Sequence, residues 1–256
     1  MTNDIDEARD WLGSEIDCGS CAHRELSATG GCRLKHACVN DRYARRIDRF
    51  FNWNRALANE YLGHPHFEVR AIASKHAAVF LLPPLLDDPE ETVRWNAARR
   101  LPKKHILKLR HDPHREVRIR IVSLLEDSDL VPMLQDEDYY VRLVIARRLA
   151  PDLLEWMLHD EEPEVRRVVA QRLPDEMLMR MAGDPEPRVR IEVARRLTGE
   201  RLAQLRGDPD WRVRYEAASR IEPELLAELV EDSDDLVREM AFSRATHNDS
   251  GKEKSL

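Results

Sequence analysis

The sequence contains no run of apolar residues long enough to cross a membrane. A membrane-spanning helix needs roughly 18 consecutive apolar residues, and no stretch of this chain approaches that length. The opening segment, residues 1–17, is acidic and lacks both the basic start and the apolar middle of a signal peptide. We therefore expect a cytoplasmic protein.

Glycine is also scarce, with nine residues in a chain of 256. Few tight loops are therefore available to hold a ligand. The sequence has no phosphate-binding glycine loop, no metalloprotease motif and no nucleophile constellation. These absences argue against a redox enzyme or a hydrolase, so we expect no catalytic residues. The net charge of -7 and the pI near 5.8 argue against general binding to nucleic acid.

Cysteine is absent from the whole chain after residue 38. The four cysteines read C-x2-C-x10-C-x5-C, at Cys18, Cys21, Cys32 and Cys38. In a cytosolic protein this clustering favours a bound metal over disulfides. Structural zinc prefers two C-x2-C pairs, whereas an iron–sulfur cluster tolerates irregular spacing, so the single pair favours the cluster. Two nearby histidines, His23 and His36, keep a mixed zinc site open.

Most of the chain is an internal repeat. The pair Val-Arg recurs every 24 residues without slippage, at Val69, Val93, Val117, Val141, Val165, Val189, Val213 and Val237. Five residues before each valine stands an aspartate, except at the first repeat, where His64 takes its place. Most of these aspartates precede a proline. Asp-Pro is typical of a helix start, with the carboxylate at the N-cap and proline at the first helical position.

Each repeat therefore predicts two helical elements. Counted from the valine, apolar residues lie at 0, +4, +5 and +8, which is one face of a helix of about twelve residues. A break, often at proline, precedes a short second element with apolar residues three or four apart, which we also expect to be helical. Neither helix can bury its apolar face alone, so the repeats must stack into an all-α solenoid.

The unit D-P-x-x-x-V-R-x-x-(V/A)-A-x-R-L resembles the leucine-rich repeat variant family, over roughly residues 64–245. The resemblance implies alternating α- and 3-10 helices in a right-handed superhelix without a sheet. It also implies an amino-terminal domain that binds a 4Fe-4S cluster, whose ligands here would be the four cysteines. We expect a cysteine-cluster domain at 1–40, an amphipathic linker or capping helix at 41–63, eight repeats at 64–247 and a disordered tail at 248–256.

Two sets of arginines recur with the repeats. Position +1 is occupied by Arg70, Arg94, Arg118, Arg142, Arg166, Arg190, Arg214 and Arg238. It falls at about 100° on the helical wheel, inside the buried arc, so we expect its stem to face the core. Its guanidinium would bind the recurring aspartates or helix-ending carbonyls. Position +7 holds Arg100, Arg148, Arg172, Arg196, Arg220 and Arg244. We expect these to be more exposed, pairing with acids of adjacent repeats or binding an anionic partner.

The segment 41–63 shows two helical faces. One carries Arg42, Arg45, Arg46 and Arg49, and the other carries Phe50, Trp53, Leu57 and Tyr61. We expect the apolar face to dock on the first repeat and cover the open end of the stack. The arginine face would be solvated beside the metal domain, where an acidic partner could bind it.

These features favour a binding or scaffold protein that carries an iron–sulfur cluster with a structural, redox-sensing or electron-transfer role. Solenoids commonly present a surface to a protein partner. The first alternative is a zinc-stapled repeat protein that binds nucleic acid or an acidic protein through its arginine flanks. The second alternative is a component of an electron-transfer system. The sequence does not identify the partner.

Overall fold

The computed structural model describes residues 7–252, and the chain divides into two compact units, Met1–Asp129 and Leu130–Leu256. Both units are helical, and residues 7–252 contain only two isolated β-bridges and no strand. The prediction of an all-α repeat solenoid is therefore confirmed. The expected right-handed superhelix stays a prediction, because the placement of one unit on the other is not determined.

The 3-10 helices carry η labels. The elements of the first unit are α1 (Arg24–Ala28), α2 (Ala44–Trp53), η2 (Arg55–Tyr61), α3 (Phe67–His76), η3 (Val79–Leu81), η4 (Pro83–Asp87), α4 (Glu91–Ala98), α5 (Lys103–Ile106), η5 (Leu107–His111), α6 (Arg115–Ile121) and η6 (Val122–Leu124). The short helix α7 (Asp127–Leu130) crosses the boundary between the units. The elements of the second unit are η7 (Val131–Met133), α8 (Tyr139–Arg148), η8 (Pro151–Met157), α9 (Pro163–Arg172), η9 (Asp175–Met181), α10 (Pro187–Arg196), α11 (Gly199–Ala203), η10 (Gln204–Gly207), α12 (Trp211–Ala218), η11 (Pro223–Leu225), η12 (Leu229–Glu231) and α13 (Asp235–Lys252).

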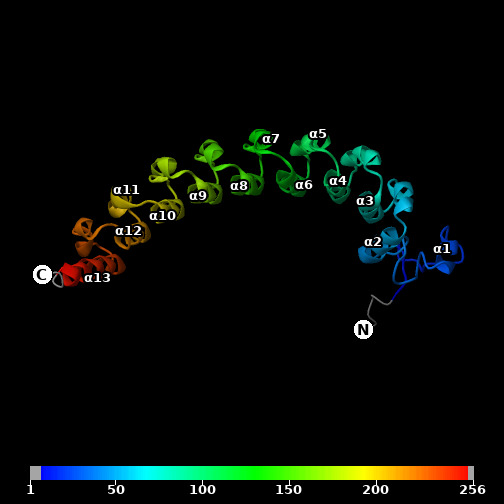
Figure 1. The fold of residues 1–256 in the computed structure, drawn as a ribbon, viewed down its shortest axis with the longest axis horizontal. Helices are drawn as coiled ribbons and strands as arrows, with labels where there is room; N and C mark the ends of the chain where they lie inside the picture. The colour runs from blue at the N-terminus through cyan, green and yellow to red at the C-terminus, as the bar shows by residue number, and fades with distance from the viewer. Residues whose placement is uncertain (1–6, 253–256) are drawn as a thin grey trace. The chain divides into compact units, whose positions relative to one another are not determined.

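Within each unit the longer α-helices lie side by side in one layer, and the short α- and 3-10 helices form a second layer (Figure 1). The core between the layers comes from the predicted positions. In the repeat at Val189, the residues at 0, +4 and +5 are fully buried, and Leu197 at +8 is 3% exposed. The short elements contribute buried residues such as Leu154 and Met157. The 3-10 character of many of these elements agrees with the family resemblance.

The predicted helix start is wrong by two to three residues. Asp88 is not the N-cap of α4, which begins at Glu91 after the N-cap Glu90. Instead, the Asp88 carboxylate accepts the backbone N–H of Glu90 at 2.9 Å, which closes an Asx turn ahead of the helix. Proline therefore lies in this turn, and the α-helices of the repeats have seven to ten residues up to α12.

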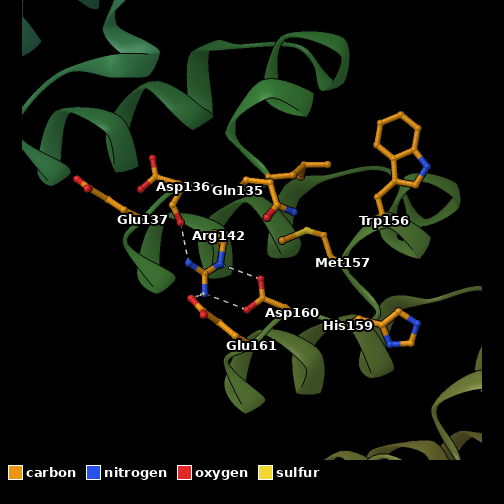
Figure 2. A pocket seen from close by; sticks show the side chains of 10 residues that line it. Gln135, Asp136, Glu137, Arg142, Trp156, Met157, His159, Asp160 and Glu161 are labelled. Atoms are coloured by element: carbon orange, nitrogen blue, oxygen red, sulfur yellow. Dashed lines mark hydrogen bonds and ion pairs between the residues drawn. The ribbon is translucent and has the colours of Figure 1, made fainter.

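The aspartate does not occupy the N-cap position because it binds the arginine of the preceding repeat. Arg94 donates from Nε and Nη2 to the carboxylate of Asp112 at 2.7 and 2.6 Å, and from Nη1 to the Asp88 carbonyl at 2.8 Å. The same link joins Arg70 to Asp88, Arg142 to Asp160, Arg166 to Asp184, Arg190 to Asp208 and Arg214 to Asp232. Figure 2 shows the pair at Arg142 lining a pocket, with Glu161 as an additional partner. The predicted role of the +1 arginines is confirmed at these positions.

The predicted pairing of a +7 arginine with an acid of the adjacent repeat is seen at Arg196, which binds Asp175 at 2.6 Å. Most +7 arginines also donate to backbone carbonyls of the preceding helix, which the sequence did not predict. Arg220 donates to the carbonyls of Ala194 and Leu197 at 2.8 and 2.9 Å. Arg100 and Arg244 make the same pair of bonds one repeat behind them. These guanidinium groups satisfy carbonyls that a helix end leaves without partners.

The segment 41–63 is not one helix. It forms α2 and then the 3-10 helix η2, with the chain turning at Asn54, whose Nδ2 donates to the carbonyls of Gly31 and Phe50 at 2.7 and 2.9 Å. The helix α2 packs on α3, as predicted. Two expectations fail, however: Trp53 is 46% exposed, and Arg46 is buried in an ion pair with Asp41 at 2.9 Å.

The carboxy-terminal boundary of the repeats stays a prediction. The helix α13 continues to Lys252, into the segment 248–256 that the sequence predicts to be disordered, and residues 253–256 lie outside the described range.

Candidate metal centre

Cys32 and Cys38 lie at the two ends of a tight turn in the first unit. The turn closes through Arg33 and Ala37, whose backbone groups exchange two hydrogen bonds of 2.8 Å. Lys35 at its tip has a φ of 62°, which lets the chain reverse within five residues. A local hydrogen-bonded turn therefore fixes the spacing of the second cysteine pair. The C-x2-C pair lies just before α1.

The charges of Cys18 and Cys21 act on both Cys32 and Cys38. Burial, together with the nearby charges of Asp41, Cys21 and Cys18, raises the pKa of Cys38 to about 11. Burial also raises the pKa of Cys32, and again the charges of Cys21 and Cys18 add to the shift. Thiolates that disfavour one another's ionisation in this way are stabilised when a cationic centre lies among them.

Cys21 receives hydrogen bonds that the sequence did not indicate. The backbone N–H of His23 donates to its sulfur at 3.4 Å, and Nδ2 of Asn40 donates at 3.5 Å. Hydrogen bonds to cluster sulfurs are one of the means by which a protein tunes an iron–sulfur centre. Asn40 lies two residues beyond Cys38, and no spacing rule points to it.

The two histidines that kept a mixed zinc site open have other partners. His23 shares a short hydrogen bond between its Nε2 and the hydroxyl of Tyr61, and its ring packs against Phe50. The Nδ1 of His36 lies 2.9 Å from Nη1 of Arg49, which also donates to the His36 carbonyl. Burial lowers the pKa of His36, as do the charges of Arg49 and Arg33. The structure therefore associates both histidines with residues outside the cysteine set.

The donor set fits a thiolate-bound group in chemical type. The four cysteines are free thiols, ranging from exposed at Cys18 to buried at Cys38. Over residues 7–252, no group of three or more His, Cys, Asp or Glu side chains is arranged to hold a metal ion as it stands. Both histidines have other partners, so the cysteine sulfurs are the soft ligands that remain in this part of the chain.

Tyr61 ties this region to the repeats. Burial raises its pKa to about 12, together with the charges of Cys21, Glu60 and Cys38, so the phenol stays protonated at neutral pH. Its ring contacts His64 and the ring of Phe51 on α2, with centroids 5.9 and 5.5 Å apart. The cysteine segment and the start of the solenoid thus share one aromatic cluster.

Comparisons with known proteins agree with this architecture. Residues 8–60 match a family model described as LRV protein FeS4 cluster, and residues 163–186 match the leucine rich repeat variant model. A solved structure described as a leucine-rich repeat variant with a novel repetitive protein structural motif is 43% identical, with a TM-score of 0.82. That alignment covers 90% of this chain and 98% of the solved chain.

A curated relative is also similar over part of its length. An uncharacterized 27.7 kDa protein in the nifB 3' region of Rhodobacter capsulatus is 50% identical over 99 residues. The match covers 39% of this chain and 40% of that protein.

None of the helices in the described part of the chain is long and apolar enough to cross a membrane.

Proposed function

This chain belongs to the leucine-rich repeat variant family, and we propose that it is a non-enzymatic binding protein that carries a 4Fe-4S cluster on Cys18, Cys21, Cys32 and Cys38. The cluster would give the solenoid a redox-responsive end, and the protein would work in the cytoplasm. The repeats would offer their surface to a protein partner, as solenoids commonly do.

The observation that carries the proposal is the set of four free cysteines between residues 18 and 38, which lies wholly within the match to the cluster model. After burial, the pKa of Cys32 is raised by Cys21 and Cys18, and Cys38 responds to the same two residues. A segment this short has too small an apolar core to gather ionisable thiols without a compensating cation. The match of residues 8–60 to a model described by an FeS4 cluster supports iron over zinc.

A bound 4Fe-4S cluster would supply one-electron chemistry. The chain's own residues would hold it and shape its surroundings: the four thiolates as ligands, with the His23 N–H and the Asn40 amide donating to the Cys21 sulfur. Asn54 holds the carbonyl of Gly31 beside Cys32 and so fixes the loop that carries this ligand. These contacts anchor the centre to α2 and through it to α3.

The test is anaerobic purification of the full chain, followed by a visible absorption spectrum and analysis of iron, acid-labile sulfide and zinc. The Cys32→Ser variant removes one proposed ligand, and His36→Gln removes a histidine from the mixed alternative. We expect a brown protein with about four iron and four sulfide per chain, an intact His36→Gln variant and loss of the cluster in Cys32→Ser.

Three outcomes would each overturn a part of the proposal. A colourless protein that holds one zinc after strictly anaerobic handling would make the amino-terminal segment a structural staple. Loss of metal in both variants alike would indicate a mixed cysteine–histidine site. Turnover of a substrate with an electron donor would refute the expectation that the protein is not an enzyme.

A further inference from the structure

The turn between Cys32 and Cys38 carries an exposed basic surface. It consists of Arg33, Leu34, Lys35 and His36 on the turn, with Arg49 and Trp53 beside them on α2, and we call it the turn patch. Arg33 and Lys35 are exposed and have no ion pair with any residue in the range 7–252. Arg49 donates only to His36.

The positive charge of this region is uncompensated. Between Cys18 and Leu57 the chain has eight Lys and Arg residues against three Asp and Glu residues, although its net charge is -7. Two of the three acids are engaged away from the turn. Asp41 is buried against Arg46, and Asp48 lies 3.7 Å from Lys75 and 3.3 Å from His76 of α3. Within residues 7–252, no carboxylate forms an ion pair with Arg33, Lys35 or Arg49 of the turn patch.

The turn patch also has an apolar part. Trp53 is 46% exposed and Leu34 is 38% exposed. The ring of His36 packs on Trp53, with centroids 5.6 Å apart, and is held by Arg49. An exposed tryptophan braced by neighbours and surrounded by cations resembles the anchor residues of protein interfaces, where Trp and Arg are enriched.

We propose that the turn patch is the docking surface for an acidic one-electron carrier protein. The inference rests on the proposed iron–sulfur function, because the patch is built on the loop that joins two of the four ligands. Along the chain, Arg33 of the patch is one residue from Cys32 and His36 is two residues from Cys38, so a partner bound there would lie beside two of the proposed ligands. One electron leaves the reduced carrier's metal centre and enters the cluster, or passes the other way, and no bond or proton changes hands.

Electrostatic complementarity acts mainly on the association rate, so kinetics provide the test. The full-length holoprotein is mixed anaerobically with two probes, an acidic plant-type 2Fe-2S ferredoxin and a basic cytochrome c. The second-order rate constant of electron exchange is followed at low and high ionic strength, in whichever direction the potentials allow. We expect the ferredoxin rate to fall as salt is added and the cytochrome rate to rise.

The deciding variant is Arg33→Glu/Lys35→Glu, which reverses the charge of the patch without touching a hydrogen-bonded side chain. It should slow exchange with ferredoxin about tenfold or more at low ionic strength. The control is Arg120→Glu, which reverses one exposed arginine elsewhere in the same unit, over the ring of Trp95. It should change the ferredoxin rate by less than about twofold.

Dithionite separates the two proposals. In one outcome, dithionite reduces the wild type and both variants equally, while the rate constant of exchange with ferredoxin is the same for the wild type and Arg33→Glu/Lys35→Glu. That result would refute the docking surface and leave the proposed cluster intact. If dithionite produces no spectral change in any of them, the redox function fails and the inference falls with it. A wild type that self-associates in sedimentation, and loses this in the double variant, would assign the patch to a second copy of the chain and overturn the proposal.

Discussion

Removing one partner of the buried ion pair between Arg190 and Asp208 should cost far more than removing one partner of a surface pair. The two side chains are 8% and 3% exposed and are joined by two hydrogen bonds of 2.7 Å. Nη1 of Arg190 also donates to the Asp184 carbonyl at 2.7 Å. Replacing the arginine by methionine keeps much of its apolar stem but leaves a buried carboxylate without its partner. We expect a loss of about 3–5 kcal/mol.

The matched control is the pair between Lys108 and Asp87, which also links neighbouring repeats but lies at the surface. Its side chains are 47% and 73% exposed, although its nitrogen–oxygen distance is 2.5 Å. Solvent screening should reduce the effect of Lys108→Ala to at most about 1 kcal/mol. The short distance alone would suggest the opposite ranking, so burial is the variable under test.

Amide hydrogen exchange measures both variants locally, which suits a solenoid whose stability is a sum over repeats and their interfaces. Arg190→Met should lower the opening free energy of α10 and α12 most and leave α3 and α4 unchanged. In the double variant Arg190→Met/Asp208→Leu, the loss should be smaller than the sum of the single losses by about 2–3 kcal/mol. An Arg190→Met effect no larger than that of Lys108→Ala would refute the reasoning.

Three further predictions concern pH, helix ends and the cysteine loop. The hydrogen bond from Arg214 lowers the pKa of Asp232 below 3.8 and outweighs burial. The pair should therefore stabilise the fold above about pH 3.8 and lose this contribution as the pH falls below it; an Asp232→Asn variant with the same acid sensitivity of its urea midpoint would contradict this. Arg220→Met removes three bonds to helix-ending carbonyls, those of Ala194, Arg195 and Leu197, and should cost about 1.5–3 kcal/mol by chemical denaturation. The exposed control Arg195→Met should cost under about 0.5 kcal/mol, and equal losses would assign no special role to the carbonyl bonds. Asn54→Ala frees the Gly31 carbonyl and should cost about 1–3 kcal/mol and speed cluster loss in air, whereas unchanged decay of the visible spectrum would disconnect Asn54 from the centre.

The repeat could be predicted from the sequence because its register never slips. The 24-residue spacing of Val-Arg determines which residues face the core, and helical geometry then turns the +1 arginine inward. The helix start could not be read in the same way. Asp-Pro is a good N-cap signal locally, but an ion pair with the preceding repeat holds Asp112 and its equivalents in a turn before the helix. A non-local contact overrode a local preference.

The series of Arg–Asp pairs ends before α2, and this explains why the predicted solvation of the arginine face of α2 is wrong. The aspartate that would pair with Arg46 would lie 18 residues later, as in every described pair, but His64 occupies that position. Arg46 turns to Asp41 instead and becomes buried, so the arginine face of α2 is not simply solvated. His64 keeps half of the aspartate's role, because its Nδ1 accepts the backbone N–H of His66 at 3.1 Å.

The recurring residues of this chain are therefore largely committed to its own structure. The +1 arginines bind aspartates and carbonyls of adjoining repeats, and the +7 arginines bind the carbonyls that end the preceding helices. A +1 guanidinium held by an aspartate and one or two carbonyls, such as that of Arg94, has little capacity left for a phosphate or a carboxylate from outside. Specific recognition must come from residues that do not recur. The basic turn between Cys32 and Cys38 is such a place, since it combines unpaired charge, an exposed tryptophan and proximity to the proposed ligands. Exchange with the acidic carrier that is sensitive to Arg33 but not to Arg120 would separate recognition from architecture in this protein.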